Sequence, residues 1–152
     1  GGGKKVDPMT STFIQIIEEK AQPAGQVMVN AEALNQGLQN SGHVSLYGLQ
    51  FDTGKSELKA ESQAQLQELI SILKTQSTLN VIVVGHTDNV GNIDANLLLS
   101  QARAQSIVQA LIQAGIDKRR LMAKGLANFA PIASNANEQG RALNRRVEIV
   151  VQ

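Results

Sequence analysis

An almost uninterrupted apolar run near the middle of the chain constrains the fold more than any other feature. In the segment 79–84 only Asn80 is polar, and the last four residues, Val81 to Val84, are all β-branched. Strands of this kind are covered on both faces, so the run predicts a central strand with helices packed on its sheet. It leads into Gly85-His86-Thr87-Asp88-Asn89, which puts polar side chains at the end of the strand.

An amphipathic segment lies on each side of this strand. Before it, Ser56 to about Thr75 predicts a helix with Ser56 as its cap, because leucine and isoleucine recur at three- and four-residue spacing. After it, Asn96 to Ala114 predicts a second long helix, which Gly115 ends.

Three further strands are predicted around these elements. One runs from Val44 through Phe51, a core residue, to the turn at Thr53-Gly54, and another covers Leu121 to Leu126. After a polar loop at Asn135 to Gln139, the last strand alternates Val147, Ile149 and Val151 with Arg146, Glu148 and Val150. The order strand, helix, strand, helix, strand, loop, strand predicts an α/β fold, an α+β sandwich with helices packed on a mixed sheet.

Residues 1–43 are predicted to form an accessory segment ahead of a domain at 44–152. This segment reads as a short helix at Thr10 to Lys20, a brief strand at Gln26 to Asn30 and another helix at Ala31 to Gln39. Gly1 to Gly3 are interpreted as a remnant of cloning.

Composition argues against several classes of function. The 14 basic and 13 acidic residues nearly cancel, and no basic cluster is interleaved with aromatics, so no nucleic-acid partner is expected. There is no cysteine and the two histidines lack ligand spacing, so no metal or cofactor is expected. No run reaches the roughly 20 apolar residues that span a bilayer, so any membrane association is assigned to a part absent from this chain. The oligomeric state is left open.

Asp88 and Arg103 form a candidate site for a small zwitterion. Arg103 lies two helical turns after Asn96, so both side chains share one helix face near the end of the central strand. A guanidinium clamps a carboxylate and an ionised aspartate accepts from an ammonium, a combination that suits an amino acid head group. Spacing leaves two alternatives open: Asp88 and Arg103 bridge each other, or Asp88 accepts from loop amides.

No catalytic residue is predicted, and the protein is expected not to be an enzyme. Ser100 falls in a helix without a Gly-x-Ser-x-Gly turn, and His86 is interpreted as a hydrogen-bonded structural residue. Arg145 and Arg146 open the last strand on opposite faces, so one is expected to face the site and the other to be a surface charge.

Several motifs together resemble the OmpA-like C-terminal domain, in the family's order and spacing over about residues 44–152. They are Phe51-Asp52-Thr53-Gly54-Lys55, Gly85-His86-Thr87-Asp88, Asn96-x-x-Leu99-Ser100-x-x-Arg103-Ala104, Gly125, Pro131, Gly140-Arg141 and Asn144-Arg145-Arg146-Val147.

The resemblance implies a βαβαββ module that binds peptidoglycan non-covalently through the meso-diaminopimelate of the stem peptide. By the same resemblance Asp88 receives the ligand's ammonium and Arg103 its carboxylate. Thr87, Asn96, Leu99 and Arg145 would line the pocket, with Phe51 and Asp52 at its rim. The implied location is the periplasm, attached to the outer membrane, within a lipoprotein-like envelope protein anchored to the wall.

Two departures from the family pattern concern the rim of the pocket, and the second of them supports an alternative function. Gly54 stands where many relatives carry a polar residue, and Leu97-Leu98-Leu99 occupies a place where a charge is frequent. The alternative is a structural or protein-interaction domain of the cell envelope that has lost its affinity for the ligand.

Overall fold

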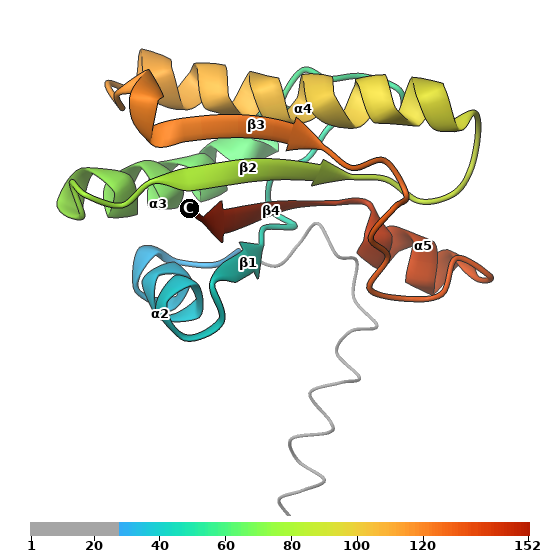
Figure 1. The fold of residues 1–152 in the computed structure, drawn as a ribbon, viewed down its shortest axis with the longest axis horizontal. Helices are drawn as coiled ribbons and strands as arrows, with labels where there is room; N and C mark the ends of the chain where they lie inside the picture. Colours follow the sequence, from blue (N-terminus) through green and yellow to red (C-terminus); the bar gives the residue numbers. More distant parts are fainter. Residues whose placement is uncertain (1–27) are drawn as a thin grey trace, which may run out of the picture.

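The described part of the chain is built around a four-stranded sheet with the order β1-β4-β2-β3 (Figure 1). The computed structural model describes residues 28–152. β2 pairs in parallel with β3 and antiparallel with β4, and β4 pairs antiparallel with β1, so the predicted mixed sheet with an interior β2 is confirmed. The strands are β1 (His43–Ser45), β2 (Val81–His86), β3 (Leu121–Gly125) and β4 (Arg146–Val151).

Helices supply the other side of the core. Leucine and isoleucine side chains of α2, α3 and α4 pack with the sheet in one hydrophobic cluster. The helices of the described residues are α2 (Ala31–Ser41), α3 (Gln63–Thr75), α4 (Ile93–Gln113) and α5 (Glu138–Asn144), with 3-10 turns η4 (Ala60–Ser62) and η5 (Lys118–Arg120).

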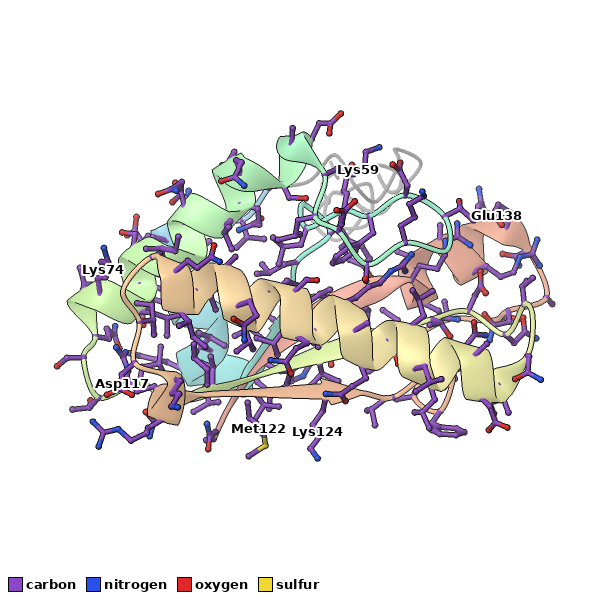
Figure 2. All side chains as sticks on the ribbon, turned by 90° about the horizontal axis from the view of Figure 1, so that it is seen from above. Lys59, Lys74, Asp117, Met122, Lys124 and Glu138 are labelled. Carbon is purple, nitrogen blue, oxygen red and sulfur yellow. The ribbon has the colours of Figure 1, made fainter. Side chains whose placement is uncertain are left out.

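Within the described residues, helices pack on one face of β2, and the strand is largely buried on both faces, as the apolar run predicted. Val81 and Val83 are fully buried against the helices. Met122 and Lys124 of β3 point away from α4 on the opposite face (Figure 2), where Met122 is 43% exposed. On this face Val84 is still buried, and its register partners are Glu148 and Lys124 of the flanking strands. An apolar run therefore identified an interior strand but not the number of layers.

Two glycines let α4 lie directly on the sheet. Gly85 and Gly125 are register partners on β2 and β3. A Cβ at Gly85 would lie 2.4 Å from the Ser100 carbonyl oxygen, and a Cβ at Gly125 would lie 2.3 Å from the Gln101 nitrogen. Any larger residue would push the backbone of α4 off the strands.

Gln101 binds the outer edge of β3 at the same place. Its Nε2 donates to the Ala123 carbonyl at 3.0 Å, and its Oε1 accepts from the Gly125 N–H at 2.8 Å. One side-chain amide thus satisfies a donor and an acceptor of a strand that, among the described strands, has a neighbour on only one side.

The predicted helix at Ala31 to Gln39 is confirmed and continues to Ser41, where Gly42 ends it with a φ of 80°. The strand predicted at Gln26 to Asn30 is wrong over residues 28–30, which are not in a strand. There the side-chain amide of Gln65 takes the place of a neighbouring strand, since it accepts from the Val29 N–H and donates to the Val29 carbonyl.

The helix predicted at Thr10 to Lys20 lies outside the described residues. The boundary at residue 43 stays a prediction. On its N-terminal side, Leu34 and Leu38 of α2 are buried in the same cluster as the sheet.

The chain between β1 and α3 differs from the prediction. The strand expected from Val44 to Phe51 ends at Ser45, because the chain turns and the Leu49 N–H donates to the Leu46 carbonyl. Phe51 is only partly buried and forms an isolated bridge with Leu58. These contacts hold residues 51–59 as a loop, so the helix begins at η4 rather than at Ser56 and ends at Thr75 as predicted.

The C-terminal elements are mostly as predicted. α4 begins at Ile93, three residues early, because the Asn92 side chain accepts from the Ala95 N–H. Gly115 follows its end with a φ of 102°. β3 and β4 are confirmed, but the loop predicted at Asn135 to Gln139 is wrong at its end, where α5 starts at Glu138.

We expect the substitution Gly85→Ala to lower the free energy of unfolding by about 1–3 kcal/mol or more, because backbone atoms of α4 cannot move aside as a flexible side chain can. Gly125→Ala should behave similarly. Urea denaturation of both variants measures the change, and a midpoint equal to that of the unchanged chain would contradict the close contact.

Candidate functional site

A pocket of about 900 Å³ lies where β2 ends, between the 51–59 loop, α4 and α5. Seven of the eight predicted site residues line it, although they come from distant parts of the sequence. They are Phe51, Thr87, Asp88, Asn96, Leu99, Arg103 and Arg145. The structure thus brings this set together, while their roles in binding stay predictions.

Asp88 is 9% exposed and holds two partners. Its Oδ2 accepts from Nη1 of Arg145 at 2.6 Å, and its Oδ1 accepts from the Val90 N–H at 2.9 Å. Of the two alternatives left open by spacing, the loop amide is therefore present. The other alternative, an ion pair between Asp88 and Arg103, is not formed within residues 28–152, because Asp88 pairs with Arg145 instead.

Arg103 is held by the 51–59 loop. Its Nε donates to the Lys55 carbonyl at 2.8 Å, its Nη2 donates to the Asp52 carbonyl at 3.1 Å, and its guanidinium lies 4.9 Å from the centre of the Phe51 ring. Burial, and then the positive charge of Arg145, lower the pKa of Arg103. Within the described residues its charge has no carboxylate partner, so it can accept an anion.

Asp52 is the one predicted residue outside the pocket wall. Its carboxylate lies 3.5 Å from Nζ of Lys59, and only its carbonyl oxygen reaches Arg103. The main chain of Asp52 therefore positions Arg103, which a prediction based on side chains could not reveal.

The loop between β2 and α4 is fixed by its own polar side chains. The Thr87 hydroxyl donates to the Asp88 carbonyl at 2.7 Å, and Nδ2 of Asn96 donates to the Val90 carbonyl at 2.9 Å. The Thr87 N–H donates to the Ala127 carbonyl in the loop after β3. These bonds set the position of the Asp88 carboxylate before any ligand arrives.

Arg145 was predicted to line the pocket, but neither of its two carboxylate partners was predicted. Its Nη2 donates to Oε2 of Glu138 at 2.5 Å, in addition to the bond between Nη1 and Asp88. These bonds raise the pKa of Arg145 and lower that of Glu138. The sequence did offer one signal for α5, because Asn137 is a residue type that favours a helix cap and Glu138 follows it directly.

Arg146 is buried, so the prediction of a surface charge is wrong. It is 5% exposed, its Nη2 donates to the Ala130 carbonyl, and its Nε lies 3.5 Å from Oε2 of Glu148. Glu148 also meets His86 at 3.2 Å and His43 at 3.5 Å. His86 thus has a carboxylate partner on the sheet, as expected of a structural residue.

No three histidine, cysteine, aspartate or glutamate side chains within residues 28–152 are placed to hold a metal ion. Over the same residues, every helix is too short or too polar to cross a membrane.

The model of the OmpA family matches residues 50–145. The chain belongs to the OmpA family. The OmpA-family match includes the end of β2 and most of the pocket described above.

Curated relatives and solved structures agree with this assignment. The chain is 42% identical over 101 residues to the probable lipoprotein YiaD of Escherichia coli, covering 66% of this chain and 46% of YiaD. It is 39% identical over 104 residues to the outer membrane porin F of Pseudomonas fluorescens, covering 68% of this chain and 32% of the porin. The chain therefore spans less than half the length of these two relatives.

Two solved structures share the fold. The peptidoglycan-associated lipoprotein of Burkholderia pseudomallei superposes with a TM-score of 0.63 at 31% identity, covering 68% of this chain and 88% of that one. The cell wall anchor of the type VI secretion system of Pseudomonas aeruginosa gives a TM-score of 0.63 at 29% identity, covering 80% of this chain and 94% of that one.

We expect the substitution Glu148→Gln to remove a stabilisation that depends on pH. The hydrogen bond from His86, together with the charges of Arg146 and His43, holds the pKa of Glu148 at about 2 against its ordinary 4.5. Because the folded state binds this proton more weakly than the unfolded state, the contribution is complete above about pH 4.5 and is lost as the pH falls towards about 2.

Thermal unfolding of the unchanged chain and of Glu148→Gln measures this effect between about pH 5 and pH 2.5. The difference between their midpoints should shrink as the pH falls. The exposed Glu61, replaced by glutamine, serves as the control and should show no such trend. A difference that stays constant over this range would show that Glu148 does not contribute in this way.

Proposed function

We propose that this OmpA-family domain binds peptidoglycan non-covalently through the meso-diaminopimelate of the stem peptide. Through this binding it anchors an envelope protein to the cell wall and catalyses no reaction. The names of two proteins with similar structures support the class of ligand, since one is a peptidoglycan-associated lipoprotein and the other a cell wall anchor. We further propose a periplasmic location with attachment to the outer membrane, as the names of YiaD and porin F suggest.

The observation that carries this proposal is the separation of two opposite charges on one pocket wall. The Asp88 carboxylate and the Arg103 guanidinium both line the pocket, and neither neutralises the other. A zwitterion can therefore bind Asp88 with its ammonium and Arg103 with its carboxylate. A pocket of about 900 Å³ falls within the range of ligand sites, and it exceeds the needs of one amino acid head group.

Selectivity follows from Arg103. Diaminopimelate differs from lysine by one carboxylate at the end of its side chain. A lysine-containing stem peptide would leave the half-buried guanidinium without an anion, whereas diaminopimelate supplies one. The site should therefore prefer the diaminopimelate peptide.

We expect Asp88→Ala and Arg103→Ala each to weaken binding of a diaminopimelate stem peptide by about 2–5 kcal/mol, the range for removing one member of a desolvated charge pair. Isothermal titration calorimetry with diaminopimelate and lysine peptides is the measurement. Two charge-matched controls, Asp94→Asn on the exposed side of α4 and Arg119→Ala on η5, should bind as the unchanged chain does. Equal affinity for both peptides would contradict the proposal.

A second candidate function is a protein-interaction domain that has lost its affinity for the ligand. The start of α4 favours it, because Leu98 is 74% exposed and Ile93 and Leu97 are also exposed. Sedimentation with purified peptidoglycan sacculi separates the two. Retention that Asp88→Ala abolishes supports wall binding, whereas no retention of the unchanged chain favours the interaction domain.

A further inference from the structure

The ammonium acceptor of the proposed site is already occupied by a cation of the chain itself. Arg145 donates to Asp88 at 2.6 Å, and the Asp88 side chain is only 12% exposed. A ligand ammonium that binds this carboxylate enters beside the guanidinium, and the repulsion between two cations at one nearly buried carboxylate favours exchange of one for the other.

Glu138 determines where the displaced guanidinium can go. Arg145 uses one terminal nitrogen for Asp88 and the other for Glu138, which it meets at 2.5 Å. When the first bond is lost, the second can stay. Arg145 then keeps a counterion and remains at the pocket instead of competing for Asp88.

Glu138 is itself held in place. Its Oε1 accepts from Nε of Arg141 at 3.2 Å, and Nη1 of Arg141 donates to the Asn135 carbonyl at 2.9 Å. α5 thus presents a fixed carboxylate to Arg145. Figure 2 shows Glu138 at the end of the molecule where α4 begins, which is also the pocket end.

The charges around Arg103 also favour a role for Glu138 in holding Arg145. Arg103 and Arg145 both line the pocket. Burial, and then the positive charge of Arg145, lower the pKa of Arg103, so the two guanidiniums repel each other. When a ligand ammonium binds Asp88, Arg145 loses the carboxylate that balanced its charge. The negative charge of Glu138 then limits the repulsion between the two arginines.

We propose that Glu138 is a positioning residue that retains Arg145 when a ligand ammonium displaces it from Asp88. This inference rests on the function proposed above and adds to it a residue that need not touch the ligand. Arg145 would change from bridging two carboxylates to pairing with Glu138 alone. The affinity for an ammonium ligand then depends on both carboxylates.

The test compares Glu138→Gln with the unchanged chain in calorimetric titrations with a soluble stem peptide that carries meso-diaminopimelate. Arg145 and Glu138 are both partly exposed, so a modest effect is expected, a loss of affinity of about two- to fivefold. Glu138→Asp, which keeps the charge, should recover part of this loss. Glu61→Gln, a carboxylate removed elsewhere on the surface, should have no effect.

A double variant separates the role of the Arg145–Glu138 pair from a general effect of charge. In an Arg145→Gln background Glu138 has no guanidinium at position 145 to hold, so adding Glu138→Gln should change the affinity no further. An equal loss in both backgrounds, or no loss in either, overturns the inference while leaving the proposed function intact. Absence of binding by the unchanged chain overturns the proposed function, and the inference with it.

Discussion

The site depends on the contact between α4 and the sheet at Gly85 and Gly125. These glycines bring the backbone of Ser100 and Gln101 onto two neighbouring strands. Arg103 lies less than one helical turn further along α4, so the same contact fixes its distance from the end of β2. A side chain at either glycine would move the arginine away from the carboxylate that follows the strand. The same close packing of α4 on the sheet therefore both completes the core and sets the positions of the two charges.

The charges of the pocket are held in position by main-chain atoms and by each other. Carbonyl oxygens of the 51–59 loop hold Arg103, a loop amide holds Asp88, and Arg145 spans two carboxylates. Groups fixed in this way lose little conformational freedom when a ligand binds. The same bonds oppose binding wherever the ligand must replace one of them, so affinity depends on how the displaced group is accommodated.

The sequence predicted the parts of the fold that rest on periodic patterns. The order of strands, both long helices and the mixed sheet follow from apolar spacing, and seven of the eight predicted site residues line one pocket. What escaped prediction depends on contacts between distant segments. The 51–59 loop is set by pairing of Phe51 with Leu58, and α5 is too short for a clear period. The ion pair of Asp88 with Arg145 joins residues 57 positions apart, and no spacing rule selects Arg145 over Arg103.

The amide of Gln101 has a consequence for how copies of this domain can meet. Within residues 28–152 β3 ends the sheet on one side, and the edge of a terminal strand can pair with a strand from another molecule. Gln101 already occupies the Ala123 carbonyl and the Gly125 N–H, the groups such a strand would need there. At the opposite side β1 has three residues, which offers a short template. Edge-to-edge joining of two such sheets is therefore disfavoured at β3, where the strand groups are already bonded, and at β1, where the strand is short.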